Sequence, residues 1–126
     1  MTTFKTAVAL GVAAIGILVG VSLHAHGSVS DVNYLTFNRP VSLPGVTLGA
    51  GTYIFERASQ NTPDVVRVMS RDRKSVYFMG FTLSIARPDA LGDHVVLLGE
   101  AARDSAPPIK AWFPIGEAVG RQFIYR

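Results

Sequence analysis

The chain contains no cysteine among its 126 residues. Disulfides, thiol nucleophiles and thiolate metal sites are therefore all excluded. Charged residues are also scarce, at 17% of the chain against 48% hydrophobic residues, and this balance excludes an intrinsically disordered protein. Twelve glycines and seven prolines without a repeating period exclude a collagen-like fibre. What remains is a chain of one-domain length that must be stabilised by packing, with aromatic side chains as the largest contributors.

The N-terminal segment is typical of a secretory signal peptide. A single lysine precedes an uncharged, mostly apolar run over residues 7–23, and the small residues Ala25 and Gly27 stand two apart, as a signal peptidase requires. We predict a signal peptide over residues 1–27 that forms an apolar helix and is cleaved near these small residues. The mature domain of residues 28–126 is predicted to be secreted or periplasmic. The alternative is an uncleaved membrane anchor, because the run reaches the roughly 17 residues that the shortest membrane-spanning helices need.

The predicted mature domain is only mildly basic, with eleven lysines and arginines against nine aspartates and glutamates after residue 27. This balance does not predict nucleic-acid binding. Apolar residues recur with a period of two, or in short runs bounded by Gly, Pro, Asn and Asp, which is typical of strands. We therefore predict an all-β domain, a single antiparallel β-sandwich or small β-barrel of about seven to eight strands. The predicted strands are Val32–Phe37, Val41–Leu43, Thr52–Arg57, Val65–Ser70, Val76–Ala86, His94–Leu98, Ile109–Phe113 and Gln122–Tyr125.

The longest predicted strand, Val76–Ala86, has an apolar face. Because successive side chains of a strand point to opposite faces, every second residue belongs to that face, and we predict that it packs in the core. Gly80 is where we expect a bulge or bend. The polar residues 71–74 before this strand predict a turn that closes a hairpin with the preceding strand. The residues of the predicted core face are Tyr77, Met79, Phe81, Leu83 and Ile85.

One segment, residues 39–55, resembles a pattern in small exported bacterial β-proteins of uncharacterised function. It reads P-V-x-L-P and then L-x-A-G-T-Y-x-F, with residue types of turns and of a core. The resemblance implies a strand followed by a hairpin-like step, and it implies no active site. From the residues themselves, we expect Gly45, Gly49 and Gly51 to supply positive φ angles in tight connections.

No constellation predicts catalysis, a metal or a cofactor. Two of the three histidines, His24 and His26, lie in the predicted signal peptide, which leaves His94 as a surface residue without the three or four converging ligands of a metal site. There is no Gly-x-Ser-x-Gly nucleophile elbow. Two acidic pairs have the residue types of glycoside hydrolysis but lie among turn residues, where solvated carboxylates are ordinary. These pairs are Glu100 with Asp104, and Asp89 with Asp93.

A basic cluster beside an aromatic strand is the predicted interaction site. Its side chains are expected to project from a hairpin end, where they could contact envelope glycan or anionic lipid headgroups. The alternative is a solvated turn without a partner. The candidate residues are Arg67, Arg71, Arg73, Lys74, Tyr77 and Phe78.

Trp112 is a further candidate, as an exposed aromatic. Simple alternation over the strand at 109–113 places it on the same face as Lys110, and a face that carries a charge is expected to be partly exposed.

The sequence therefore predicts an exported, non-catalytic β-sandwich or barrel module with a binding or structural role at the bacterial envelope or exterior. Its partner would be envelope glycan, anionic lipid or another exported protein. One alternative is a small β-barrel that binds an apolar ligand in a cavity. Another is a small secreted hydrolase.

Overall fold

A computed structural model of the chain describes residues 19–22 and 32–126, and in this part the secondary structure is strands and one short 3-10 helix, η1 (Asp89–Leu91). The all-β class predicted from the sequence is confirmed. The predicted signal helix lies outside the described residues except for Val19–Ser22, which form a strand that pairs antiparallel with Val32–Phe37. The strands are β2 (Val19–Ser22), β3 (Val32–Phe37), β4 (Val41–Leu43), β5 (Val46–Leu48), β6 (Gly51–Ser59), β7 (Thr62–Ser70), β8 (Val76–Ala86), β9 (Val96–Leu98), β10 (Ile109–Trp112) and β11 (Val119–Phe123).

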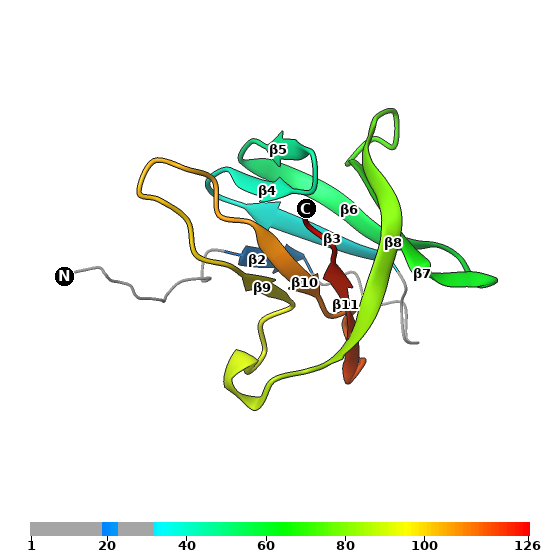
Figure 1. The fold of residues 1–126 in the computed structure, drawn as a ribbon. Coiled ribbons are helices and arrows are strands. Elements are labelled where there is room, and N and C mark those ends of the chain that lie inside the picture. Colours follow the sequence, from blue (N-terminus) through cyan, green and yellow to red (C-terminus); the bar gives the residue numbers. More distant parts are fainter. Residues whose placement is uncertain (1–18, 23–31) are drawn as a thin grey trace.

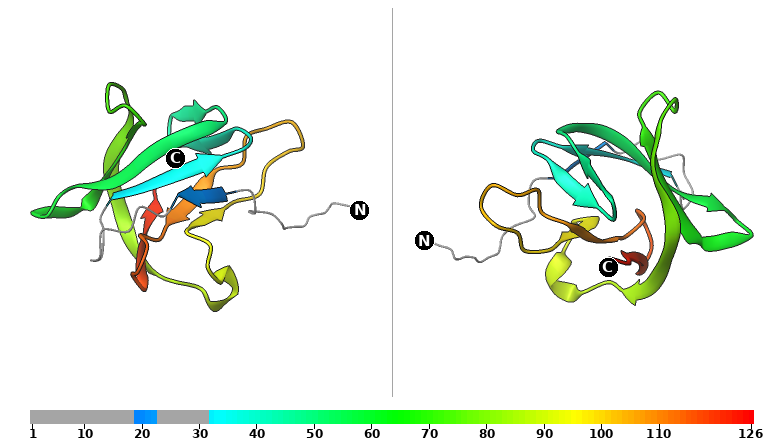
Figure 2. Two further views of the ribbon diagram at one scale, coloured as in Figure 1. Left: turned by 180° about the vertical axis from the view of Figure 1, so that it is seen from behind. Right: turned by 45° about the horizontal axis from the view of Figure 1, so that its top comes forward.

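The strands form a single curled sheet with a small second sheet beside it. Eight strands pair antiparallel in the order β2-β3-β6-β7-β8-β11-β10-β9, and β4 pairs with β5 separately. The large sheet curls into an open half-barrel, with β8 bowing along its outer side (Figures 1 and 2). The amide of Ser42 in β4 donates to the carbonyl of Pro107 at 2.9 Å, which ties the small sheet to the segment before β10.

Most strand positions follow the local sequence pattern. The bounds of β3, β4 and β8 are those predicted, and β6, β7, β9, β10 and β11 differ from prediction at one or both ends. The prediction missed β5, because three residues after a Pro-Gly turn are too few to show alternation. Gly45 and Gly51 have the expected positive φ angles of 79° and 154°, whereas the expectation for Gly49 is wrong.

The core lies inside the curl and consists largely of aromatic rings. Phe55 of β6 is fully buried, and its ring centroid lies 6.1 Å from Phe37, 5.9 Å from Trp112 and 6.5 Å from Phe123. These separations are those of tilted and edge-to-face aromatic pairs, which add to the free energy of burial. The rings come from strands that are far apart in the sequence, so packing in the core holds the two ends of the curled sheet together.

The predicted core face of β8 is wrong. Phe81 is 71% exposed, and Met79 and Leu83 are also more than half exposed. The opposite face points inward: Phe78 packs edge-to-face on Phe123, with ring centroids 5.4 Å apart. A Cβ at Gly80 would lie only 2.9 Å from Cζ of Phe78, so this glycine leaves room for the ring.

A β-bulge explains part of that error. Opposite β7, Val68 pairs with Phe78 and Met69 with Val76, so Tyr77 is an extra residue in β8. The predicted irregularity at Gly80 is therefore three residues earlier in the chain. Tyr77 lies against Tyr53, with ring centroids 5.5 Å apart, at the side of the core. Beyond a one-residue bulge the alternation of side chains reverses. Met79, Phe81 and Leu83, which were predicted to share the core face with Tyr77, therefore point outward.

The prediction of an exposed Trp112 is also wrong, since its side chain is fully buried. The register of β10 against β9 shifts between Ile109 and Ala111, which makes Lys110 an extra residue. Ile109 and Trp112 consequently share the inner face, although they are three residues apart. Lys110 alone points to solvent, so its charge says nothing about the face on which Trp112 lies.

A smaller cluster covers one end of the outer face. Phe113 is fully buried there, together with Leu91 of η1 and partly buried Ile85 of β8. The guanidinium carbon of Arg87 lies 5.6 Å from the centroid of the Phe113 ring. The connection between β8 and β9 thus covers the outer face near Ile85. This cover does not extend to Leu83, which is 55% exposed.

Candidate functional site

Arg71, Arg73 and Lys74 of the predicted basic cluster lie in the turn of the β7–β8 hairpin, whereas Arg67 lies within β7. The turn is closed by a hydrogen bond from the amide of Ser70 to the carbonyl of Ser75 at 2.9 Å. The carboxylate of Asp72 accepts from the Ser70 hydroxyl at 2.7 Å and from the Lys74 amide at 2.9 Å. The Ser70 hydrogen bond, followed by that of Lys74, lowers the pKa of Asp72. The turn is therefore ordered by its own side chains.

Two of the four cations are held by a buried carboxylate. Arg67 donates through Nε to Glu56 at 2.7 Å, and Arg73 donates through Nη1 to the same carboxylate at 3.2 Å. The Glu56 side chain is 6% exposed, against 28% for Arg67 and 46% for Arg73. Two arginines on one carboxylate leave this group with a net positive charge, and it lies on the outer face of the sheet.

The other two cations are free for a partner. Arg71 and Lys74 are exposed and make no ion pair within residues 32–126. Arg73, by contrast, adopts a positive φ of 66° and folds back over Met69, with Nη1 3.9 Å from the sulfur. The sequence grouped all four cations as equivalent, whereas the structure separates two anchored arginines from two free side chains.

The two aromatic candidates also have different roles. Tyr77 is 40% exposed at the rim of the core, beside Tyr53. Burial, with a smaller contribution from Tyr77, raises the pKa of Tyr53. Phe78 is a core residue, partly buried against the main cluster, and the prediction that it forms part of a surface site is wrong. Its position follows from the inward alternation after the bulge.

The structure adds an exposed apolar surface that sequence reasoning placed in the core. We call Met79, Phe81 and Leu83 the β8 stripe. Its members are 54%, 71% and 55% exposed and lie on the outer face of β8, the long bowed strand of the half-barrel in Figure 1. Large apolar side chains grouped on a surface commonly mark a contact site. The sequence signal for this surface was the alternation of apolar residues in β8. Alternation shows that one face of a strand is apolar, but it does not show whether the protein covers that face.

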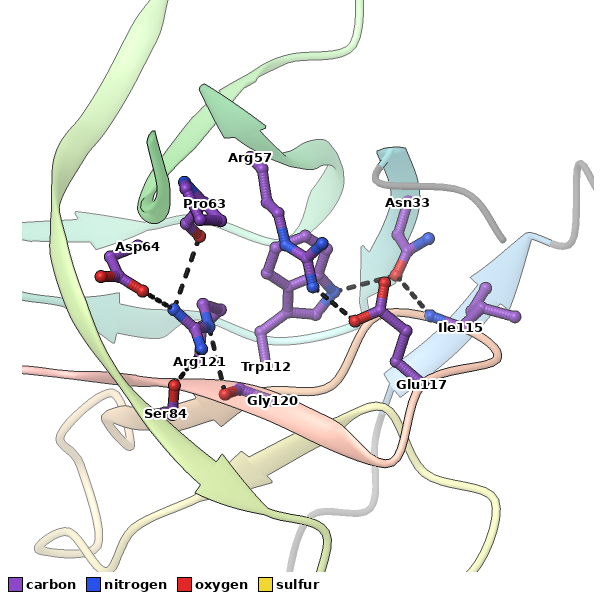
Figure 3. A network of polar contacts seen from close by, with 10 residues as sticks. All are labelled: Asn33, Arg57, Pro63, Asp64, Ser84, Trp112, Ile115, Glu117, Gly120 and Arg121. Carbon is purple, nitrogen blue, oxygen red and sulfur yellow. Dashed lines mark hydrogen bonds and ion pairs between the residues drawn. The ribbon is translucent and has the colours of Figure 1, made fainter. Parts of the chain in front are cut away.

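A polar network closes the opposite end of the half-barrel, and sequence reasoning missed it (Figure 3). Arg121 of β11 is 6% exposed and forms an ion pair with Asp64 at the start of β7. It also donates to the hydroxyl of Ser84 and, through Nε, to the carbonyl of Gly120 at 3.2 Å. These bonds join β7, β8 and β11. The carboxylate of Asp64 neutralises the charge of the buried Arg121 guanidinium.

A second group of polar contacts at this end involves the core tryptophan (Figure 3). Oδ1 of Asn33 accepts from Nε1 of Trp112 at 2.9 Å and from the amide of Ile115 at 3.2 Å. Beside it, Arg57 of β6 forms an ion pair with Glu117. These contacts join strands that are far apart in the sequence, which is a structural role. The set is not fully satisfied, because Nδ2 of the buried Asn33 has no hydrogen-bond partner among the described residues.

The remaining candidates for chemistry do not converge. His94 and the acidic residues Asp89, Asp93, Glu100 and Asp104 are all exposed. Within the described residues, no three His, Asp or Glu side chains are grouped closely enough to hold a metal ion. His24 and His26 lie outside the described residues. In the part of the chain that the structure describes, no helix is long and apolar enough to span a bilayer.

Comparisons of the chain with family models, with curated proteins and with solved structures found no match.

Proposed function

We propose that this protein is an exported, non-catalytic binding module of the bacterial envelope or exterior, and that it attaches to anionic surfaces through the β7–β8 hairpin. The observation that carries the proposal is the hairpin itself, where two free cations stand at the tip and two more lie on the outer face. Export is supported by the sequence of residues 1–27, which has the pattern of a signal peptide.

The charge on the hairpin is strongly one-sided. Four basic side chains share this end of the sheet with two carboxylates, Glu56 and Asp72, of which the first is buried. An excess of positive charge on a projecting turn attracts anionic polymers and headgroups from a distance of about a Debye length, roughly 8 Å at physiological salt. Binding of this kind needs no cavity, and the turn is already ordered by Ser70 and Asp72.

The interior supports binding by the surface and not by a cavity. Trp112, Phe55 and Phe123 fill the inner side of the sheet with ring centroids about 6 Å apart and are at most 3% exposed. An apolar ligand in the half-barrel would have to displace these rings. The alternative function as a carrier of apolar ligands therefore finds no support in the packing.

The proposal is tested by removing the two free cations. In the variant Arg71→Ser with Lys74→Ser, binding to vesicles that contain phosphatidylglycerol should fall on the order of 30-fold, because each basic residue at an anionic membrane surface contributes about 1 kcal/mol. Retention on an immobilised sulfated polysaccharide should fall in the same direction. Both effects should shrink as salt rises.

The matched control removes the same two charges elsewhere. Arg103 in the connection between β9 and β10 and Lys110 in β10 are exposed and lie outside the β7–β8 hairpin, so Arg103→Ser with Lys110→Ser changes the net charge equally without touching the hairpin. All variants are compared in the same processing state, checked by mass spectrometry of the N-terminus. Equal losses in the two double variants, or no loss in either, would refute a site at the hairpin.

A further inference from the structure

We infer that the β8 stripe inserts into the interfacial region of an anionic phospholipid bilayer while the hairpin cations contact the headgroups. This inference rests on the proposed function and narrows it to one partner, lipid. It starts from the exposure of Met79, Phe81 and Leu83, which are the most exposed large apolar side chains of the sheet. Exposed apolar area of this kind raises the free energy of the isolated protein in water, so covering it is favourable.

The stripe and the positive charges lie on the same face. In the register of β7 and β8, Arg67 stands directly opposite Met79, and Val65 stands opposite Phe81. Arg73 folds onto this face from the tip, where it meets Glu56. A bilayer approached by this face would meet apolar side chains flanked by guanidinium groups. Such a combination matches lipid acyl chains beneath phosphate headgroups.

The dimensions of the stripe favour lipid over a second copy of the chain. With about 200 Å² for each large side chain, the exposed fractions of the three stripe residues correspond to on the order of 350 Å². A stable protein interface needs roughly 800 Å² from each partner. The stripe runs along β8 and is bounded on the β11 side by Gln122, which stands opposite Leu83. Two convex sheets would touch only along this line, whereas a fluid bilayer conforms to it.

The cover of the outer face ends where the stripe begins. Ile85 continues the same row of side chains but packs against Leu91 and Phe113. The protein thus covers the apolar face of β8 near one end with its own loop and leaves the part next to the cationic tip open. A peripheral membrane protein inserts only about 5–10 Å into the boundary between headgroups and acyl chains. Its apolar residues therefore have to lie close to the cations that contact the headgroups, as the stripe does.

The test uses a fluorescent reporter in the stripe. The chain has a single tryptophan, Trp112, which is fully buried and serves as an internal reference. Phe81→Trp adds an exposed indole, and Ala102→Trp adds one as a control in the loop on the opposite side of the molecule. With phosphatidylglycerol vesicles, emission of the Phe81→Trp variant should shift to shorter wavelength and be quenched by lipids brominated near the headgroup. The Ala102→Trp variant should show neither effect.

A double variant of the stripe separates insertion from electrostatic attachment. Phe81→Ser with Leu83→Ser leaves the cations in place and should lower partitioning into the same vesicles roughly tenfold, because two partly buried apolar side chains no longer leave water. Its retention on the sulfated polysaccharide should be unchanged. The emission of Trp112 reports whether the core of each variant is intact.

The outcomes are distinguishable. If the Arg71 and Lys74 variant loses vesicle binding but the stripe variant does not, and the Phe81→Trp emission does not shift, attachment is electrostatic and insertion is refuted. If the emission shifts without vesicles as protein concentration rises, and sedimentation shows a dimer, the stripe is a contact between two copies and the lipid inference is overturned. If the charge variant and the stripe variant both bind vesicles like the wild type, both proposals fail.

Discussion

Of the glycines in the described strands, Gly120 of β11 leaves the least room for a side chain, and adding one methyl group there should destabilise the fold. A Cβ at this position would lie 2.4 Å from Cδ2 of Phe113 and 2.7 Å from the carbonyl oxygen of Trp112. The ring is enclosed by Leu91 and Ala111, and the carbonyl belongs to β10, which pairs with β11 at Trp112 and Arg121. Neither atom can withdraw without separating these strands.

Gly120→Ala should therefore cost about 3 kcal/mol of unfolding free energy, the upper end for overpacking in a filled core. The matched control is Gly49→Ala, because nothing lies within 4 Å of a Cβ there and its φ is not positive. That change should be neutral or stabilising by up to about 1 kcal/mol. Urea unfolding followed by the emission of Trp112 measures both, because burial of its indole is lost only on unfolding.

A double variant locates the cause. If the Phe113 ring is the main obstacle, Gly120→Ala combined with Phe113→Ala should cost clearly less than the sum of the two single changes, since the ring that the methyl meets is absent. A loss below about 1 kcal/mol for Gly120→Ala alone would show that Phe113 does not lie over the glycine. The described packing of the outer face would then be incorrect.

Three further predictions follow from burial, protonation and the N-terminus. Phe55→Ala should lose about 3–5 kcal/mol in urea unfolding, whereas Phe81→Ala should lose about 1 kcal/mol at most; equal losses would contradict the assigned faces of the sheet. Burial raises the pKa of Tyr125 to about 12 from 10.0, so its contribution to stability is full below pH 10 and is lost as pH rises toward 12. Tyr125→Phe should make unfolding free energy less dependent on pH over that range, and an unchanged slope would exclude this residue as the cause. Mass spectrometry of protein from the native host should find an N-terminus between Ala25 and Ser28; an intact N-terminus in the membrane fraction would indicate an anchor.

The hairpin shows how far local sequence specifies a site. Residues 71–74 are a polar stretch between two strand patterns, and such a stretch forms a turn whatever surrounds it. The position of the cations at an exposed tip was therefore predictable. The difference between them was not, because Arg67 and Arg73 meet on Glu56, a residue of another strand. Which charges remain free depends on a carboxylate that only the pairing of β6 with β7 brings near.

The sequence by itself determined most of the strand content of the domain. Alternation and the Gly, Pro and Asn punctuation act within a few residues, and they placed β3, β4 and β8 at their observed bounds. The same local rules predicted an antiparallel arrangement, since turns this short can join only antiparallel strands. They also indicated which residues of a strand share a face.

Only the tertiary structure decided which of the two faces was buried. In β8 both faces offer apolar residues, and the core took Phe78 because its ring fits against Phe123 above the space that Gly80 leaves open. Trp112 entered the core because Lys110 is an extra residue that reverses the alternation of β10. A bulge is set by the register between paired strands. Since the side-chain period of a strand is two, one extra residue exchanges inside and outside for all that follow it.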